Sequence, residues 1–297
     1  MSLATQGIHI GPAGNSESFY AAGFKKTTET FAWQMERFGL DAFEIPFGRG
    51  IAMSLETAEA IGIAAREAGV SLSAHAPYYI NLASKDEEQA GKSHAYILET
   101  ARLLDAMGGE RVVVHLGSPK AMARGDAMQH CARRLLQTRE LLQDHGLGAI
   151  RICPETMGRP SVIGTLDEVL FLVGLDDSFL PCIDFAHLHA LGGALNGPDG
   201  FARVLDRVEQ VLGLERARLM HMHFSKIEYG AKGEIRHRVF SDSGFGPDFA
   251  HLAPLLVKRG YHGTLICESR GTMAEDAHQM KAMLVAAEGF PAETGLF

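Results

Sequence analysis

Histidine and carboxylate residues recur at the ends of short apolar runs in this chain of 297 residues. Six such runs end in His, Asp or Glu, and a helix-length segment separates each run from the next. Imidazole nitrogens and carboxylate oxygens without thiolate form the donor set that suits Zn²⁺, Mn²⁺ or Fe²⁺. The runs and the residues that follow them lie at positions 70–75, 112–117, 152–158, 181–187, 219–225 and 264–271.

This recurrence indicates one shared site, because a parallel barrel gathers the carboxyl ends of its strands around one mouth. Asp184 and His187 are three residues apart where the chain leaves a strand, and His221 and His223 are two apart, hence on one face of a strand. The set is too large for one tetrahedral ion, so the sequence predicts a cluster of two or three ions, with zinc as the first choice. The candidate ligands are His75, His115, Glu155, Asp184, His187, His221, His223, His237 and Glu268.

Such a cluster is suited to phosphoester chemistry. Two ions about 4 Å apart can hold a hydroxide nucleophile and stabilise the leaving oxygen of a phosphodiester. Glu155, near the middle of the chain, is the predicted bridging carboxylate and catalytic residue. Each histidine could instead hydrogen-bond to a ligand without binding the metal itself, and we expect one or two of the set to have that role.

The segments that must position these side chains alternate between strand and helix eight times. The helix expected at 54–68, for example, has Ser54 as its N-cap and Gly69 as its stop. The alternation predicts a single (β/α)₈ barrel, an α/β fold in which residues 1–297 form one domain. A doubly wound open sheet is the alternative, but no G-x-G-x-x-G follows the first strand.

Composition narrows the class of protein. A hydrophobic content of 46% with 22% charged residues is typical of a globular chain. No apolar stretch approaches the roughly 20 residues of a membrane helix, and the first residues lack the regions of a signal peptide. We therefore expect a cytoplasmic protein with no membrane partner, and reduced core cysteines, since the four lack C-x-x-C spacing. The net charge of −8 argues weakly against a polyanionic partner.

The longest irregular connection expected is 225–247, and loops of that length inside domains tend to be functional. Lys226, Arg236 and Arg238, together with Lys232, give it a local basic excess in an acidic protein. We predict that this segment closes over the substrate, binds phosphate through Lys226, Arg236 and Arg238 and supplies His237 to a metal.

The residues quoted so far carry a resemblance to endonuclease IV, the apurinic/apyrimidinic endonuclease family of the xylose isomerase-like TIM barrels. Its most specific piece is His75-Ala-Pro-Tyr-Tyr-Ile-Asn-Leu-Ala-Ser84. The resemblance implies a barrel with three zinc ions that cleaves DNA 5′ to an abasic site. It also implies that Tyr78 contacts the DNA, with Tyr79 in place of a leucine wedge and Arg49 as an approximate counterpart of an inserted arginine. The family's ligand positions correspond to His75, His115, Glu155, Asp184, His187 and Glu268.

The chain departs from this pattern after the seventh strand. The family's His-Leu-Asn-Asp-Ser-Lys aligns without gaps with residues 221–226, which selects His221 as the ligand and leaves His223 as a competing or additional one. The family's Asp-Arg-His becomes Glu234-Ile-Arg-His237, which is one residue longer and has Glu in place of Asp.

Two other functions remain open. A sugar isomerase or epimerase of the same superfamily would hold one divalent ion and move protons with carboxylates. Such an enzyme does not need His75, His115 or His187, so the sequence favours phosphoester chemistry over a sugar substrate. A non-catalytic metal-dependent binding protein is the third possibility. The one ion of the epimerase would be held by Glu155, Asp184, His221 and Glu268.

Overall fold

The computed structural model describes residues 7–48 and 50–289, so Arg49 lies outside the described residues. Eight parallel strands form two four-stranded sheets, in the orders β1-β10-β7-β6 and β2-β3-β4-β5. The bridges between Ala13 and Glu44 and between Glu155 and Cys182 join the two sheets into a ring. These strands are β1 (His9–Pro12), β2 (Ala42–Pro46), β3 (Ser71–His75), β4 (Arg111–Val114), β5 (Arg151–Pro154), β6 (Cys182–Asp184), β7 (His221–Phe224) and β10 (Thr264–Cys267).

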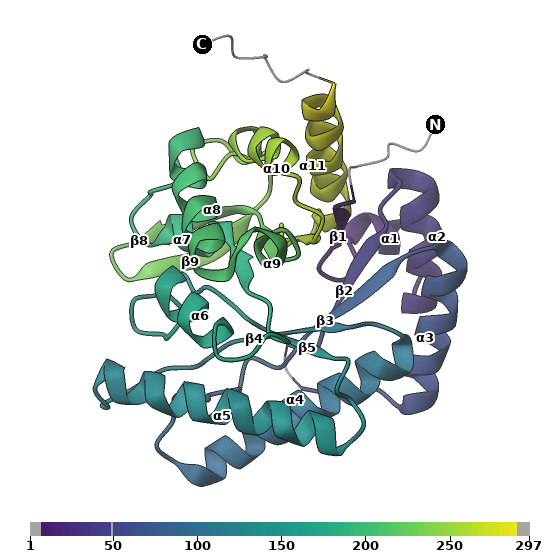
Figure 1. Ribbon diagram of the computed structural model, residues 1–297. Coiled ribbons are helices and arrows are strands. Elements are labelled where there is room, and N and C mark those ends of the chain that lie inside the picture. The colour runs from purple at the N-terminus through teal and green to yellow at the C-terminus, as the bar shows by residue number, and fades with distance from the viewer. Residues whose placement is uncertain (1–6, 49, 290–297) are drawn as a thin grey trace.

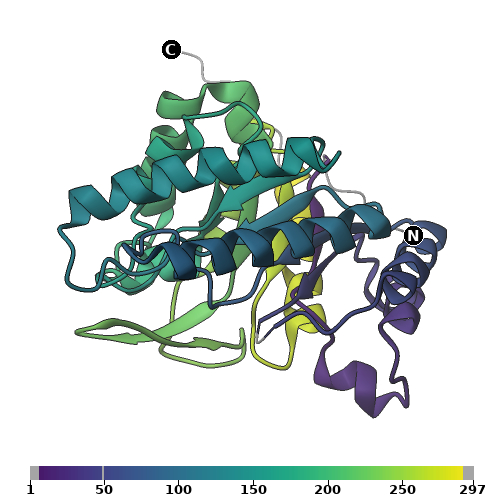
Figure 2. The same cartoon turned by 90° about the horizontal axis from the view of Figure 1, so that it is seen from below.

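Helices surround this ring, and α4 and α5 lie side by side on one flank (Figures 1 and 2). The predicted (β/α)₈ barrel is thus confirmed. The helices are α1 (Glu17–Ala21), α2 (Thr27–Phe38), α3 (Leu55–Ala68), α4 (Glu87–Met107), α5 (Arg124–Asp144), α6 (Leu166–Val173), α7 (Phe185–Ala190), α8 (Pro198–Leu212), α9 (Leu214–Arg218), the 3-10 turn η1 (Phe249–His251), α10 (Ala253–Arg259) and α11 (Met273–Glu288).

The helix boundaries follow from local capping. The hydroxyl of Ser54 accepts a hydrogen bond from the backbone N–H of Thr57, and Gly69 ends α3 in the left-handed conformation with φ of 70°. Thr165 and Glu168 form a reciprocal capping box at the start of α6. The start of α3 at Ser54 and its end at Gly69 were predicted from the sequence.

The segment 225–247 is not the irregular connection that the sequence suggested. It contains an antiparallel hairpin of β8 (Lys226–Gly230) and β9 (Gly233–Arg238), which projects from one side of the barrel in Figure 2. The buried side chain of Ile227 packs on Ala186 and Ala190 of α7. This contact fixes the hairpin beside the barrel mouth.

Apolar side chains fill the space between strands and helices in two large clusters. Side chains that face the barrel interior are far more polar and include the fully buried Glu44, His221 and His223. All four cysteines are buried and unpaired, as predicted. Among the described residues, no helix has both the length and the apolar character needed to cross a membrane.

Candidate metal centre

Glu155 lies at the centre of the converging side chains. One carboxylate oxygen, Oε2, is 3.1 Å from Nε2 of His75 and 2.9 Å from Nε2 of His115. The other, Oε1, is 3.3 Å from Nδ1 of His223 and 3.3 Å from Nδ1 of His187. Glu155 leaves the end of β5 and is buried. Its two oxygens therefore face two different groups of ligands, as a bridging carboxylate requires.

The predicted ligands form three groups whose donor atoms lie within 4.8 Å of one another. The strand ends produce this convergence, since β3, β4, β5, β6, β7 and β10 all deliver a side chain to the same mouth. The groups are His75 with His115 and Glu155; Glu155 with Asp184, His223 and Glu268; and Asp184 with His187 and His237. A fourth group of possible ligands joins His221 and His223 to Cys182, a residue that was not predicted as a ligand.

Two of the histidines are oriented by backbone carbonyls. Nδ1–H of His75 donates to the carbonyl of Ala76 at 2.8 Å, and Nδ1–H of His187 donates to the carbonyl of Thr156 at 2.9 Å. Each bond leaves Nε2 as the nitrogen that can bind a metal: that of His75 faces Glu155, and that of His187 faces Glu234. Bonds of this kind are typical of histidines that bind metal, because they fix the tautomer and the ring plane.

Glu234 lies beside the third group; the sequence analysis placed it where the family has Asp and left open whether it is a ligand. Its Oε2 lies 2.8 Å from Nε2 of His187, and the ring of His237 lies 5.2 Å from that of His187. The backbone N–H of Glu234 donates to the carbonyl of Gly158 at 2.8 Å, and a Cβ on Gly158 would lie 2.7 Å from Glu234 Oε2. A glycine at 158 therefore permits the close approach of Glu234 to His187.

A β-bulge explains how Glu234 and His237 share a face although they are three residues apart. Tyr229 is opposite Glu234 and Glu228 is opposite Arg236, so Ile235 is the extra residue of the bulged strand. Its side chain is exposed. The segment from Glu234 to His237 is one residue longer than its counterpart in the family, and the bulge at Ile235 accommodates this extra residue. Both candidate ligands therefore face the centre.

The structure separates the two histidines of β7. Nδ1 of His223 lies 3.3 Å from Glu155 Oε1 and 3.4 Å from Glu268 Oε1. His221 lies deeper, with Nε2 3.0 Å from Oε2 of Glu44. Burial lowers the pKa of His221 to about 4 despite Glu44. His223 therefore takes the place among the carboxylates that the gapless alignment gave to His221.

The histidines and carboxylates of the centre are paired with one another, and burial and this pairing shift their pKa values. Burial opposes ionisation of Glu155, but the charges and hydrogen bonds of its histidine neighbours, His115 first, hold the pKa of Glu155 well below its usual range. Burial likewise opposes a charge on His75, yet Glu155 outweighs this effect and raises the pKa of His75 to about 9. Burial raises the pKa of Glu268.

The donor set fits divalent cations. Oδ2 of Asp184 and Oε2 of Glu234 are buried and contact His187 at 3.2 and 2.8 Å, but among the described residues neither accepts a hydrogen bond of good geometry. Unpartnered buried carboxylate oxygens are costly, and a cation between them would remove that cost. Nitrogen and oxygen donors in this mixture suit zinc, manganese or iron.

The four predicted substrate-binding residues have distinct surroundings. Tyr78 is 58% exposed and stacks on His115 at 5.5 Å. Nζ of Lys226 donates to the carbonyls of Phe240 and Asp242. Both arginines contact the same carboxylate, Glu228: Arg236 at 2.7 Å and Arg238 at 2.5 Å. Their binding of phosphate stays a prediction, since their charges are already paired within the hairpin segment.

Two cavities adjoin the centre. One of about 190 Å³ is bordered by Glu44, His75, Tyr78, His237 and Glu268. The other, of about 430 Å³, runs from Tyr78 and His115 toward Gly117, Ser118 and Lys120.

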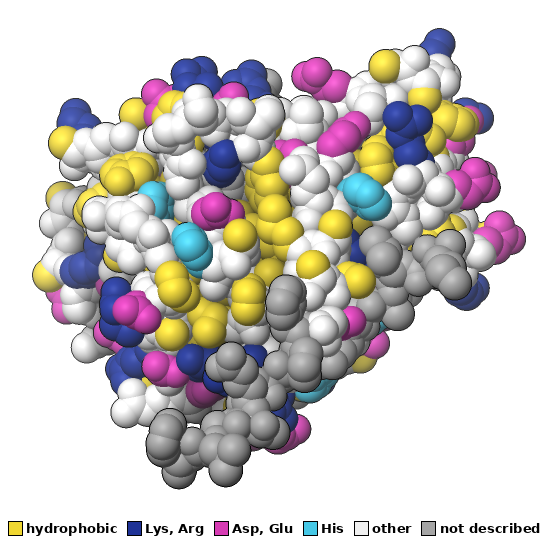
Figure 3. Space-filling view, turned by 90° about the horizontal axis from the view of Figure 1, so that it is seen from above, with side chains coloured by type: hydrophobic (Ala, Val, Ile, Leu, Met, Phe, Trp, Pro, Cys, Tyr) yellow, Lys and Arg dark blue, Asp and Glu magenta, His cyan; other side chains and the backbone are white. Residues whose placement is uncertain are grey.

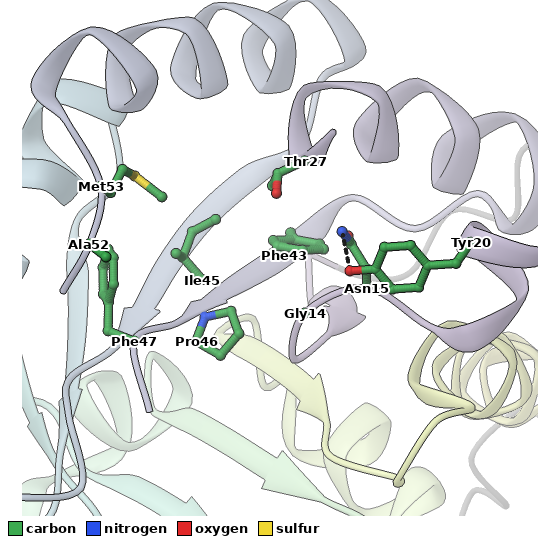
Figure 4. A pocket seen from close by; sticks show the side chains of 10 residues that line it. All are labelled: Gly14, Asn15, Tyr20, Thr27, Phe43, Ile45, Pro46, Phe47, Ala52 and Met53. Carbon is green, nitrogen blue, oxygen red and sulfur yellow. Dashed lines mark hydrogen bonds between the residues drawn. The ribbon is translucent and has the colours of Figure 1, made fainter. Parts of the chain in front are cut away.

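A third cavity of about 300 Å³ lies on the other side of β2, against Phe43 and Ile45 (Figure 4). Its polar feature is a hydrogen bond of 3.4 Å from Asn15 to the Tyr20 hydroxyl. Its described lining contains no carboxylate, histidine or thiol, so this cavity offers none of the ligand types of the metal centre. The face in Figure 3 carries acidic and basic side chains intermixed, with hydrophobic ones gathered toward its middle.

Glu44 is a residue that the sequence analysis missed. It lies inside β2, not at its end, and points into the barrel beneath the ligands. The one signal available was a charged residue within the otherwise apolar run Ala42–Pro46.

Known proteins similar to this chain include both nucleases and epimerases. An uncharacterized protein of Methanocaldococcus jannaschii is 33% identical over 238 residues, which are 79% of this chain and 84% of that protein. A "Probable endonuclease 4" of Acholeplasma laidlawii is 30% identical over 203 residues, 65% of each chain. The chain thus spans just under two thirds of that relative's length.

Solved structures share the fold at lower identity. Endonuclease IV from Thermus thermophilus superposes with a TM-score of 0.67 at 22% identity, covering 88% of this chain and 93% of that one. A D-tagatose 3-epimerase-like protein gives 0.66 at 20% identity, covering 84% and 88%. The profile of one family matches residues 34–285. The chain therefore belongs to the xylose isomerase-like TIM barrel family, with the likeness to endonuclease IV that its sequence predicted.

Proposed function

We propose that this protein is a metal-dependent phosphodiesterase that cleaves DNA 5′ to abasic sites. The observation that carries the proposal is the third ligand group, in which Glu234 and His237 of the β8–β9 hairpin converge on His187. A one-ion sugar enzyme has no use for these three residues in addition to His75 and His115. Relatives named endonuclease 4 support the same substrate class.

The residues present define what each part of the centre would do. His75, His115 and Glu155 would hold one ion, Glu155, Asp184, His223 and Glu268 a second, and His187, His237 and Glu234 a third, with Asp184 beside it. When bound, such ions supply an activated water and offset the charge of the phosphate and of the leaving oxygen. Glu155 keeps the first two groups together, and the exposed ring of Tyr78 borders both cavities at the mouth.

A sugar epimerase is the second candidate, and particular observations favour it. The arginines of the hairpin are neutralised by Glu228, the net charge is −8, and the cavity over the ligands is small at about 190 Å³. Under this alternative, Glu155, Asp184, His223 and Glu268 would hold one ion, and the substrate would be a ketose that the ion polarises.

One pair of assays separates the candidates. Protein reconstituted with Zn²⁺ or Mn²⁺ is incubated with a DNA duplex that carries a single abasic site, and in parallel with a panel of ketoses. We expect incision on the 5′ side of the lesion, lost on treatment with a chelator, and no change in the sugars. Ketose interconversion without incision would overturn the proposal.

A further inference from the structure

We propose that Glu44 is a positioning residue for the metal centre: its carboxylate fixes which nitrogen of His223 faces the ions. The inference rests on the metal centre of the proposed function but not on the identity of the substrate. It also gives His221 a role, as the residue that holds Glu44 in place.

Glu44 reaches across the barrel interior to β7. Its side chain is fully buried, and it meets His221 and His223 of a strand that is not its neighbour in the ring. These histidines are two residues apart, so both point inward at successive levels. His223 lies at the level of Glu155 and Glu268, whereas His221 lies one level below.

The contacts of the Glu44 carboxylate determine the tautomers of His221 and His223. Oε2 accepts from the Ser73 hydroxyl at 2.9 Å and lies 3.0 Å from Nε2 of His221. Oε1 lies 3.0 Å from Nε2 of His223. A carboxylate can only accept, so each histidine must carry its proton on Nε2 to satisfy this contact. The contact of His223 has the length but not the direction of a hydrogen bond, and neither atom makes an aligned hydrogen bond to another described residue. The buried thiol of Cys182 is the other polar group beside the two histidines.

With Nε2 turned toward Glu44, the nitrogen of His223 that faces the ligand groups is Nδ1. This atom lies 3.3 Å from Glu155 Oε1 and 3.4 Å from Glu268 Oε1. Without a cation, Nδ1–H donates a hydrogen bond to Glu155, and a bound cation would displace that proton. Glu44 thus prepares His223 as a ligand, in the same way that backbone carbonyls prepare His75 and His187.

His223 differs from those two histidines in one useful respect. Its orienting group is a side chain, so a substitution can remove it while leaving every ligand unchanged. Glu44→Gln keeps the volume of the carboxylate but offers at most one accepting oxygen to two Nε2–H groups. Ser73→Ala is the matched control, since it removes a donor to the same carboxylate without touching His223.

Metal affinity is the first readout. Each variant is stripped with chelator, and Zn²⁺ is returned in competition with a chromophoric chelator. We expect Glu44→Gln to weaken the binding of one ion by about ten- to a hundredfold, the usual cost of removing a group that orients a ligand, and Ser73→Ala to bind like the wild type. Wild-type affinity in Glu44→Gln, or an equal loss in both variants, would overturn the inference.

The tautomer is the second readout, and it needs no substitution. Protein with ¹⁵N-labelled histidine and bound Zn²⁺ is examined by long-range ¹H–¹⁵N correlation. We expect His223 to carry its proton on Nε2; a proton on Nδ1 would refute the role of Glu44 even if Glu44→Gln fails to fold. A wild-type protein that binds no Zn²⁺ would remove the metal centre itself and the inference with it.

Discussion

Nε2 of His187 lies 2.8 Å from Oε2 of Glu234, which joins the end of the barrel to the β8–β9 hairpin. The contact depends on the bulge at Ile235, because the bulge lets Glu234 and His237 face the same way. The contact between His187 and Glu234 distinguishes a centre with three ligand groups from a centre with a single site of four ligands.

Substitution in the hairpin should change the metal content in a specific pattern. Glu234→Ala should remove one ion per chain, since it deletes a carboxylate from the third group. Deleting Ile235 should leave the ion in place, because a regular ladder would also put Glu234 and His237 on one face. Elemental analysis of both variants tests this; loss of an ion from the Ile235 deletion would show that the bulge has another role.

Glu155→Gln should abolish activity and reduce the metal content. The amide keeps the shape of the side chain but removes the charge that offsets two neighbouring cations. We expect turnover to fall by roughly a hundredfold or more, since even residues that only orient ligands cost ten- to a hundredfold. The circular dichroism spectrum should match the wild type. Undiminished turnover would exclude Glu155 as the bridging carboxylate.

Zinc binding should strengthen with pH. In the metal-free protein, protonated His75 is paired with Glu155, and its pKa is raised from 6.5 to about 9. That stabilising contribution is fully present below pH 6.5 and is lost as the pH rises through about 9. Zn²⁺ must displace the same proton, so the difference in Tm between zinc-loaded and metal-free protein should widen over this interval. A constant difference would contradict the assignment of His75 as a ligand.

The charges of the hairpin give a prediction on DNA binding. If Arg236 and Arg238 contact phosphate, replacing both with alanine should weaken binding and flatten its salt dependence. Glu228→Gln should do the opposite, because it releases both arginines from their partner. Arg102→Ala, which removes an exposed charge near the end of α4, is the control. Equal effects of the control and the double variant would mean that the hairpin contacts no phosphate.

Much of the candidate site could be predicted from the sequence because its candidate ligands follow strand ends. His75, His115, Glu155 and Asp184 each come at the end of an apolar run, and a parallel barrel brings such ends together. The choice between His221 and His223 could not be made this way. It depends on which level of the barrel each side chain occupies, and only the partners Glu44 and Glu268 show that.

Glu44 and Glu234 were harder to find for different reasons. Glu44 lies within a strand, where its charge has no local explanation, and its partners are on β7. Glu234 depends on a bulge, and a one-residue irregularity reverses the face that a strand residue occupies. The hairpin itself was read as irregular, since its strands flank a glycine-containing turn, Gly230 to Gly233.

The metal content of the protein tests the central claim most directly. Protein purified without chelator is analysed for zinc, manganese and iron, and the ions are counted per chain. Three ligand groups that share Glu155 and Asp184 predict at least two ions, with zinc predominant. One ion or fewer would contradict the account and favour a one-ion sugar epimerase.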